Sequence, residues 1–407
     1  MTTFLELPFS PLLKANLARN GFNLPTPIQA AAIEPALAGK NVVATAPTGT
    51  GKTLAFALPI IQSLTANGVP TGIRALILSP TRELALQIDE TFKKMAAGSG
   101  LRTAVVVGGL SEHSQLQTIR KGAQVMIATA GRLDDFLDRR LVNLNGVKIL
   151  VLDEADRMLD MGFLPVLERI LAVLPIDRQT LFFSATIESS VQHLVDVHIP
   201  RSIRIEVGST TKPAERVDLH LYEVEQEGKL GLLHRLLLRD EGSFLVFART
   251  RHGAERLARR LAGHGIKTAA IHGDRSQSQR NQALRGFQDG ACRVLVATDV
   301  AARGIHVDGI SHVVNYDLPQ VPEDFIHRVG STGRAGARGT ASTFGTRLER
   351  GTVAEIERKL AIRLTRYTEA GEVAECQTDS AEQPRRWRSF GPARGTSRRR
   401  GRHVASA

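Results

Sequence analysis

The chain has 407 residues, a length that suits two domains of roughly 150 to 200 residues better than one. Its composition, 42% hydrophobic and 23% charged, is typical of a soluble globular protein and excludes wholesale disorder. The two cysteines, Cys292 and Cys376, are too few and too isolated for a disulfide framework or a thiolate metal site, and they favour a reducing cytoplasm.

The net charge of +12 is concentrated near the C-terminus. Residues 384–402 contain eight arginines and no acid, which leaves a net charge of +4 for the rest of the chain. The first ten residues carry no Lys or Arg before their apolar residues, so they do not resemble a secretion signal. No segment approaches the ~20 apolar residues of a membrane span. The sequence therefore predicts a cytoplasmic protein that does not enter a membrane.

Short runs rich in Val, Ile and Leu alternate with segments of helical period, a pattern typical of βαβ units around a parallel sheet. In the first half, strands are expected at residues 41–46, 75–79, 103–107, 125–129, 149–152 and 180–183. In the second half, they are expected at residues 219–224, 244–248, 268–271, 294–297 and 312–315. Because the same pattern appears twice, we expect two α/β domains in tandem.

A glycine-rich segment, Ala-Pro-Thr-Gly-Thr-Gly-Lys-Thr at residues 46–53, follows the first expected strand and precedes a helical pattern. Glycines allow backbone N–H groups to close around phosphate oxygens, and a helix N-terminus adds partial positive charge. Lys52 would neutralise the β- and γ-phosphates of a nucleotide, and the Thr53 hydroxyl would hold Mg²⁺. The expected phosphate-binding residues are Ala46, Thr48, Gly49, Thr50, Gly51, Lys52 and Thr53. A chance glycine-rich turn is the alternative, and Ala46 stands where the general pattern has Gly.

The expected strand at 149–152 ends in Asp153-Glu154-Ala155-Asp156. Ligands of open parallel sheets bind at the carboxyl ends of the strands, so adjacent acids at this position suit a Mg²⁺-dependent phosphoryl-transfer site. Asp153 would reach the metal, and Glu154 would orient or deprotonate the attacking water. The alternative is an acidic helix N-cap, since Asp and Glu favour that position in any protein.

Three boundaries follow from composition. Residues 208–216 are polar and lack an apolar period, which predicts a linker between a first domain (1–207) and a second (217–368). Residues 369–407 become Glu-rich and then Arg-, Gly- and Ser-rich, which predicts a disordered basic tail. Trp387 and Phe390 lie among its arginines and could stack on unpaired bases, although a merely solvated charge run is the alternative.

The sequence resembles the DEAD-box RNA helicases, which are named after the tetrapeptide Asp-Glu-Ala-Asp found here at 153–156. The resemblance extends from Phe4 to Tyr367 and includes about a dozen motifs in the order that the family has them. The resemblance implies two RecA-like domains, with ATP in the cleft between them and RNA lying across both. It implies RNA-dependent hydrolysis of ATP to ADP and phosphate, which opens short duplexes or displaces bound protein without reading sequence. Comparable tails occur in the bacterial RhlE-like group.

The resemblance also assigns roles to residues. Phe4, Phe22 and Gln29 belong to a segment that recognises adenine, and an amide such as Gln29 offers the donor and acceptor that adenine needs. The expected RNA contacts follow strands and bind the sugar-phosphate backbone. They are Pro80, Arg82, Gly109, Thr129, Arg132, Arg280 and Thr298. The family has Pro where Ala130 stands, and ordinary strand-end turns are the alternative reading of these loops.

A further set is expected to couple hydrolysis to strand separation and to closure of the two domains. It comprises Asp156, Ser184, Thr186, Gln277, Arg303, His327 and Arg328. Arg334 would reach the γ-phosphate from the second domain and completes the expected catalytic set with Lys52, Asp153 and Glu154. ATP and RNA would each favour the closed state, so each should tighten binding of the other.

Two positions depart from the family pattern. Ser331 replaces one of two arginines that face the γ-phosphate, and His306 replaces an acid that holds the ribose. We therefore expect slow ATP turnover. A slow ATP-gated RNA clamp or assembly scaffold remains the alternative function, and a DNA helicase is a weaker one. Ribosomal or RNA-decay proteins are possible partners that the sequence does not identify.

Overall fold

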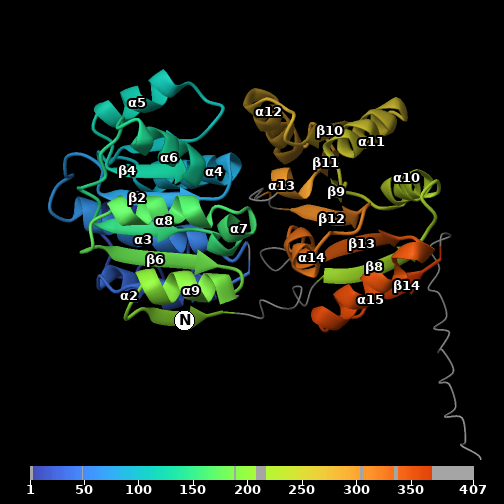
Figure 1. The fold of residues 1–407 in the computed structure, drawn as a ribbon, viewed down its shortest axis with the longest axis horizontal. Helices are drawn as coiled ribbons and strands as arrows, with labels where there is room; N and C mark the ends of the chain where they lie inside the picture. The colour runs from blue at the N-terminus through green and yellow to red at the C-terminus, as the bar shows by residue number, and fades with distance from the viewer. Residues whose placement is uncertain are drawn as a thin grey trace, which may run out of the picture. The chain divides into compact units, whose positions relative to one another are not determined.

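The structure is a computed structural model that describes residues 3–47, 49–187, 189–207, 217–302, 307, 309–333 and 338–368. The expected linker and tail therefore lie outside the described residues. So do four single residues with expected roles or departures, namely Thr48, Arg303, His306 and Arg334. The described residues form two seven-stranded sheets flanked by helices (Figure 1), and the strand pairs in both sheets are parallel. This arrangement confirms the predicted α/β fold with two parallel sheets in tandem.

The first sheet has the strand order β3-β4-β2-β5-β6-β1-β7. Its strands are β1 (Val42–Thr45), β2 (Ala75–Ser79), β3 (Thr103–Val106), β4 (Val125–Thr129), β5 (Ile149–Leu152), β6 (Gln179–Ser184) and β7 (Ile203–Glu206). The helices between them are α1 (Pro11–Arg19), α2 (Pro27–Leu37), α3 (Lys52–Thr65), α4 (Arg82–Met95), α5 (Glu112–Arg120), α6 (Ala130–Asp138), α7 (Ala155–Asp160), α8 (Leu164–Val173) and α9 (Ser189–His198). Strands β1, β2 and β5 are buried at every residue, as expected where helices cover both faces of a parallel sheet.

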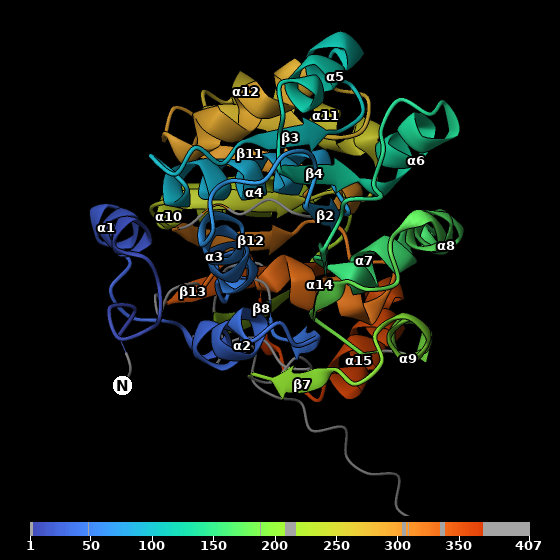
Figure 2. The same cartoon turned by 90° about the vertical axis from the view of Figure 1, so that its left-hand side faces the viewer.

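Two hydrophobic clusters cover the faces of this sheet. One contains residues of α1 to α4 and the other residues of α6 to α9, and Figure 2 shows α1, α2 and α3 on one side with α6, α7, α8 and α9 on the other. Neighbouring residues of β6 divide between the clusters, since Phe182 packs in the second and Phe183 packs beside Phe56 in the first. No helix among the described residues is long and apolar enough to cross a membrane.

The second sheet has the order β10-β11-β9-β12-β13-β8-β14. Its strands are β8 (Val217–Glu223), β9 (Ser243–Phe247), β10 (Thr268–Ile271), β11 (Val294–Ala297), β12 (Ile310–Asn315), β13 (Gly339–Gly345) and β14 (Thr365–Tyr367). Its helices are α10 (Lys229–Arg239), α11 (Arg251–Gly263), α12 (Gln277–Gln288), α13 (Asp299–Ala302), α14 (Pro322–Val329), the 3₁₀ turn η2 (Arg347–Glu349) and α15 (Arg350–Lys359). Counted from its own first strand, each sheet has the order 3-4-2-5-6-1-7, so the repeat expected from the sequence is a repeat of topology.

The eleven expected strands are all present, with shifts of at most two residues at their ends. Three strands were not expected: β7, β13 and β14. The sequence of β13 (Gly-Thr-Ala-Ser-Thr-Phe-Gly) lacks Val, Ile and Leu, yet most of the strand is buried because it pairs with β12 on one side and β8 on the other. Strand β7 is largely exposed at the sheet edge, and β14 has only three residues. Periodicity therefore fails where position in the sheet, rather than composition, decides burial.

Aromatic contacts hold the short strand β14 against β8. The Tyr367 ring stacks on Tyr222 with 5.3 Å between ring centroids, and the His220 ring lies 4.5 Å from Tyr367. Burial lowers the pKa of His220, and the charge of nearby His312 acts in the same direction. The neutral imidazole of His220 is therefore the form that suits the folded state.

This lowered pKa predicts a pH dependence of stability. The unfolded chain binds a proton at His220 near its ordinary pKa of about 6.5, whereas the folded chain resists it, so this contribution to stability is present above about pH 6.5 and is lost as the pH falls toward the folded pKa. We expect His220→Phe to flatten the decrease in urea midpoint between about pH 8 and about pH 5, measured by circular dichroism. The exposed His252→Gln should leave the decrease unchanged. An identical decrease in His220→Phe and the wild type would contradict the assignment.

Candidate nucleotide and nucleic-acid site

The glycine-rich loop lies between β1 and α3 and has a backbone that only glycine adopts easily. Gly49 and Gly51 have φ angles of 79° and 91°, in the left-handed region. A side chain on Gly51 would also collide with the Gln29 amide. The Ala46 N–H donates to the Ser184 carbonyl at 3.0 Å, which attaches the start of the loop to the end of β6. The glycines thus permit the backbone conformation of the loop, and the hydrogen bond from Ala46 attaches the loop to β6.

The segment expected to recognise adenine is bonded to this loop. Gln29 is buried, accepts a hydrogen bond from the Thr26 N–H at 2.9 Å, and donates from Nε2 to the Gly51 carbonyl at 3.0 Å. The Thr26 hydroxyl donates to the Thr50 carbonyl at 2.7 Å. Thr26 lies in the segment expected to recognise adenine, and it precedes α2 as its N-cap residue. These bonds fix α2 relative to the phosphate loop.

The two aromatic residues expected near adenine differ in exposure. Phe4 is 1% exposed and belongs to the hydrophobic core, whereas Phe22 is 39% exposed. Of the two rings, Phe22 is the one with accessible surface.

Lys52 begins α3 with its side chain buried, and its Nζ donates to the Ala46 carbonyl at 2.9 Å. Asp153 follows β5 and is only 2% exposed. Burial and the negative charge of Glu154 raise the pKa of Asp153 to about 7, and the ammonium group of Lys52 acts in the opposite direction. A buried cation and a buried carboxyl group therefore lie close together beneath the loop, with the half-buried Thr53 next to Lys52.

Glu154 has a strained backbone and a buried ionic partner. Its φ of 50° is in the left-handed region, which is uncommon for residues other than glycine and concentrates at functional sites. Its N–H donates to Asp153 Oδ1 at 3.1 Å, and its Oε2 accepts a hydrogen bond from the Arg157 guanidinium. Arg157 was not expected from the sequence. The spacing of three residues, from the N-cap residue of α7 to a residue within the helix, is the only sequence signal for the pair.

Asp156 joins the acidic segment to the end of β6. Its Oδ2 accepts hydrogen bonds from the N–H groups of Ala185 and Thr186, both at 2.9 Å, and from the Thr186 hydroxyl at 3.2 Å. The Ser184 hydroxyl donates to the Thr186 carbonyl at 2.6 Å. The structure therefore brings Asp156, Ser184 and Thr186 together, as the coupling hypothesis requires.

Arg82 packs over the glycine pair that follows β3. A side chain on Gly108 would lie 2.9 Å from Arg82 Nη2, and one on Gly109 would collide with Nη1. Pro80 is buried at the end of β2, and the Thr81 hydroxyl caps α4 by accepting from the Leu84 N–H at 3.3 Å. Gly109, whose φ of 77° lies in the left-handed region, is the glycine that this turn requires, because the flexible Arg82 side chain could move away from a side chain at position 108.

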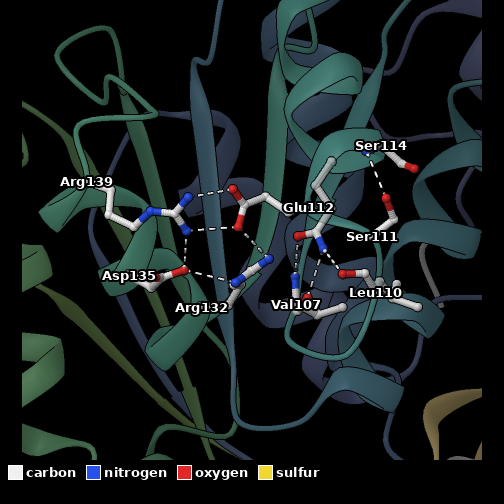
Figure 3. A network of polar contacts seen from close by, with 9 residues as sticks. Val107, Leu110, Ser111, Glu112, Ser114, Arg132, Asp135 and Arg139 are labelled. Carbon is white, nitrogen blue, oxygen red and sulfur yellow. Dashed lines mark hydrogen bonds and ion pairs between the residues drawn. The ribbon is translucent and has the colours of Figure 1, made fainter.

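Arg132 lies in an ion-pair network that joins α5 and α6 (Figure 3). Its Nη2 pairs with Glu112 at 3.2 Å and its Nη1 with Asp135 at 2.9 Å, and Arg139 pairs with the same two acids. Arg139 holds the pKa of Glu112 below its ordinary value. The neighbouring Thr129 precedes α6 as its N-cap residue. Both terminal nitrogens of Arg132 are thus engaged by carboxylates that sequence reasoning did not identify.

Glu83 connects two of the expected site residues. Its Oε1 accepts from Gln277 Nε2 at 2.8 Å, and its Oε2 pairs with Arg280 Nη2 at 2.9 Å. Burial lowers the pKa of Arg280. Arg82 also reaches Gln277, with 3.4 Å between Nη1 and Oε1. Thr298, the remaining expected RNA contact, is buried where β11 ends.

Arg328 is held inside the α/β unit of the second sheet. Its Nε and Nη2 contact the two carboxylate oxygens of Asp299 at 2.6 and 2.7 Å, and its Nη1 donates to the Asp317 carbonyl at 2.7 Å. The guanidinium also lies 5.0 Å from the centre of the Phe247 ring. This bidentate geometry is that of a buried positioning residue for the end of α14. Asp299, its partner, was not among the expected site residues.

Ser331 follows α14 and is buried, with its hydroxyl donating to the His327 carbonyl at 3.4 Å. Burial, reinforced by the charge of Arg157, lowers the pKa of His327, so its neutral form is favoured. Four residues considered in the sequence analysis lie outside the described residues, so their expected roles are not tested: Thr48, Arg303, His306 and Arg334.

Comparisons with known proteins identify the family. Residues 26–194 match the DEAD/DEAH box helicase family model, and residues 228–336 match the helicase conserved C-terminal domain. The chain is 40% identical over 361 residues to the DEAD-box ATP-dependent RNA helicase CshA of Geobacillus kaustophilus, covering 88% of this chain and 76% of the relative. It is 41% identical over 347 residues to the ATP-dependent RNA helicase CshA of Listeria monocytogenes, covering 84% and 66%.

Solved structures agree with this family. Saccharomyces cerevisiae Dbp5 bound to RNA and ADP BeF3 aligns with a TM-score of 0.82 at 30% identity, covering 91% of this chain and 96% of that one. The DEAD-box helicase Mss116 bound to single-stranded RNA and UDP-BeF aligns with a TM-score of 0.84 at 28% identity, covering 90% and 80%. The family matches agree with the two parallel sheets of the same topology and with the lysine-bearing loop beside the Asp-Glu-Ala-Asp segment. This chain belongs to the DEAD-box ATP-dependent RNA helicases, which are RNA-dependent ATPases.

Proposed function

We propose that the chain hydrolyses ATP to ADP and phosphate at the carboxyl ends of β1 and β5, with Lys52, Thr53, Asp153 and Glu154 as the reacting-site residues. The observation that supports this most directly is the buried Lys52 ammonium beside the buried Asp153 carboxyl under a glycine-rich loop. Lys52 would balance the charge of the terminal phosphates, and the loop N–H groups would bind their oxygens.

The residues at this position also fit Mg²⁺. A carboxylate on Asp153 and a hydroxyl on Thr53 are hard oxygen donors, which Mg²⁺ prefers, and the cation would favour the ionised form of Asp153 that burial disfavours. When bound, Mg²⁺ supplies positive charge at the phosphate oxygens. The protein's own part is to hold these donors, with the Asp153 Oδ1 fixed by the Glu154 N–H.

Glu154 is the proposed group that orients or deprotonates the attacking water. Its pairing with Arg157 supports this role, because the arginine sets the direction of the carboxylate. Asp156 would transmit changes at the acidic segment to residues 184–186 through its three hydrogen bonds.

RNA is proposed to bind by its sugar-phosphate backbone, which explains the mixture of arginines, hydroxyls and loop backbone in the expected set. That set remains Pro80, Arg82, Gly109, Thr129, Arg132, Arg280 and Thr298. Because Arg132 and Arg280 are already paired with acids, binding would require phosphates to share or displace those partners. Unwinding of this kind is local and independent of sequence.

Hydrolysis is proposed to depend on Arg334, with Arg303 and His327 completing the coupling set. Ser331 and His306 would weaken this side of the site, so turnover is slow. We further propose a cytoplasmic location and a basic tail that adds RNA affinity. Ribosomal or RNA-decay proteins are candidate partners.

A second function, a slow ATP-gated RNA clamp, is favoured by one specific observation. Ser331 is buried with its hydroxyl turned to the His327 carbonyl, and a serine cannot supply the charge of the arginine that the family pattern has there.

The first test concerns the phosphate loop. Lys52→Ala should abolish RNA-stimulated ATP hydrolysis, because removing the buried ammonium leaves the terminal phosphates without their main countercharge. Phosphate release is measured with RNA, with DNA and without nucleic acid. The exposed Lys94→Ala should behave as the wild type. Failure of every RNA to stimulate the wild type, or full turnover in Lys52→Ala, would refute the helicase proposal.

The second test restores the family residue. If charge at the γ-phosphate limits the rate, Ser331→Arg should raise RNA-stimulated turnover by roughly tenfold or more, since a finger arginine contributes on the order of 10³. Ser331→Ala, which removes only the hydroxyl, should keep the original rate. A rate for Ser331→Arg equal to that of Ser331→Ala would refute the explanation of slow turnover.

The third test concerns the network of Figure 3. Glu112→Gln removes the carboxylate shared by Arg132 and Arg139, so phosphates compete better for both guanidinium groups. We expect RNA to bind more tightly, with a log K against log salt slope steeper by about 1, measured by fluorescence anisotropy. Glu34→Gln, which neutralises an exposed acid on α2, is the control. Weaker binding in Glu112→Gln would instead mean that the acid orients Arg132 for RNA.

A further inference from the structure

A cavity opens where the strands of the first sheet begin, which we call the amino edge. The phosphate loop lies at the opposite ends of the strands, the carboxyl edge. The cavity lies where β1, β5, β6 and β7 begin and has a volume of about 410 Å³. Its lining residues are Gly39, Lys40, Asn41, Lys148, Asp177, Arg178, Gln179 and Arg201. Strands of four to six residues separate it from the carboxyl edge by roughly 13 to 20 Å.

Two amide side chains give this cavity a fixed wall. Asn41 accepts from the Thr180 N–H at 2.8 Å and donates to the Pro200 carbonyl at 3.1 Å. Gln179 donates from Nε2 to the carbonyls of Ala36 and Lys40, both at 2.8 Å. These bonds join the chain segments before β1, β6 and β7, so the cationic residues between them are carried on a preformed frame.

The charges that line the cavity are predominantly positive. Lys40, Lys148 and Arg201 are exposed, and Arg178 is half-buried. Among the lining residues that the structure describes, Asp177 is the one acid; it is fully exposed and 3.7 Å from Lys148, so it neutralises little of this charge. The four cations and one carboxylate leave a charge of +3 around the opening.

Arg178 is the innermost of these cations. Its Nη1 donates to the Pro175 carbonyl at 2.6 Å, while its buried Nε has no hydrogen-bond partner in the part of the chain that the structure describes. Burial lowers the pKa of Arg178, which reflects the cost of holding this charge without an anion. An anionic group in the cavity would offset that cost.

Basic residues continue beyond the cavity along the amino edge of the first sheet. In spatial order the neighbouring strands β2, β5, β6, β1 and β7 are preceded by Arg74, Lys148, Arg178, Lys40 and Arg201, respectively, each within two residues of the strand. With strands about 4.8 Å apart, this row extends over roughly 19 Å. A single small anion would meet only the cavity, whereas a polymer with a charge at every repeat would meet the whole row.

We propose that this amino-edge row binds the sugar-phosphate backbone of RNA, at a second site beyond the one proposed at the carboxyl edge. The ligand is a part of the substrate that flanks the strand held for unwinding. Lysine and arginine side chains without base-directed amides or aromatic rings suit phosphates and not base recognition. Occupying both edges with one RNA would raise overall affinity through effective concentration, without a change in the chemistry at Lys52.

The test uses the full chain and two RNAs, a short single strand and the same strand extended by a duplex flank. In the test variant, Lys40→Gln, Lys148→Gln and Arg201→Asn are combined. Asn is chosen for position 201 because Arg201 has a φ of 55°, a left-handed conformation that Asn tolerates. The matched control removes three exposed cations of the other α/β unit with Arg256→Gln, Arg260→Gln and Lys359→Gln.

We expect the test variant to bind the extended RNA about tenfold more weakly than the control, with a log K against log salt slope lower by about 3, because three phosphate contacts are lost. Affinity for the short strand and its stimulation of ATP hydrolysis should not change. Equal affinities of test and control variants for the extended RNA would overturn the proposal, as would an equal loss for both RNAs. Selective loss of polyglutamate binding would assign the row to acidic protein instead. Because the short strand reports on the carboxyl edge alone, failure of the proposed function would appear separately, as absent stimulation in the wild type.

Discussion

The constraint on which the site depends is the burial of parallel strands on both faces of each sheet. Parallel neighbours require a crossover helix after every strand, so the loops that leave strand ends gather at one edge. Residues separated by a hundred positions then meet: Lys52 follows β1, Asp153 follows β5, and Ser184 ends β6, which pairs with both. The expected site residues are concentrated there because the backbone offers its free N–H groups and helix N-termini at that end of the strands.

Buried and part-buried hydrogen bonds connect these loops to the elements around them. Gln29 ties the phosphate loop to α2, Asp156 ties the acidic segment to β6, and Arg328 ties α14 to Asp299. A buried polar group left without its partner costs about 1 to 3 kcal/mol, so each tie favours one arrangement of its loop strongly. The same bonds can transmit change, because moving one partner forces the other to move or to lose its hydrogen bonds.

The two edges of the first sheet differ in how far their positive charges are neutralised. At the carboxyl edge, positive groups such as Lys52 and Arg132 face carboxylates, and a ligand must compete with them. At the amino edge, the row that includes Lys148, Arg178 and Arg201 meets little negative charge. RNA binding that depends on the nucleotide state can therefore use the carboxyl edge. RNA binding by electrostatic attraction alone can use the amino edge of the same α/β unit.

The sequence alone determined the fold class, the eleven regular strands, the phosphate loop and the acidic segment, because hydrophobic period and short motifs are local properties. It could not reveal β13, whose Gly, Thr and Ser residues are buried only because two strands flank it, or β14, which depends on Tyr367 meeting His220 and Tyr222. Nor could it identify Arg157, Glu112 or Asp299 as partners of the site, since pairing across loops depends on distance in space. The tertiary structure alone decided which charges are neutralised and which remain available, because burial and proximity arise only when distant segments pack together.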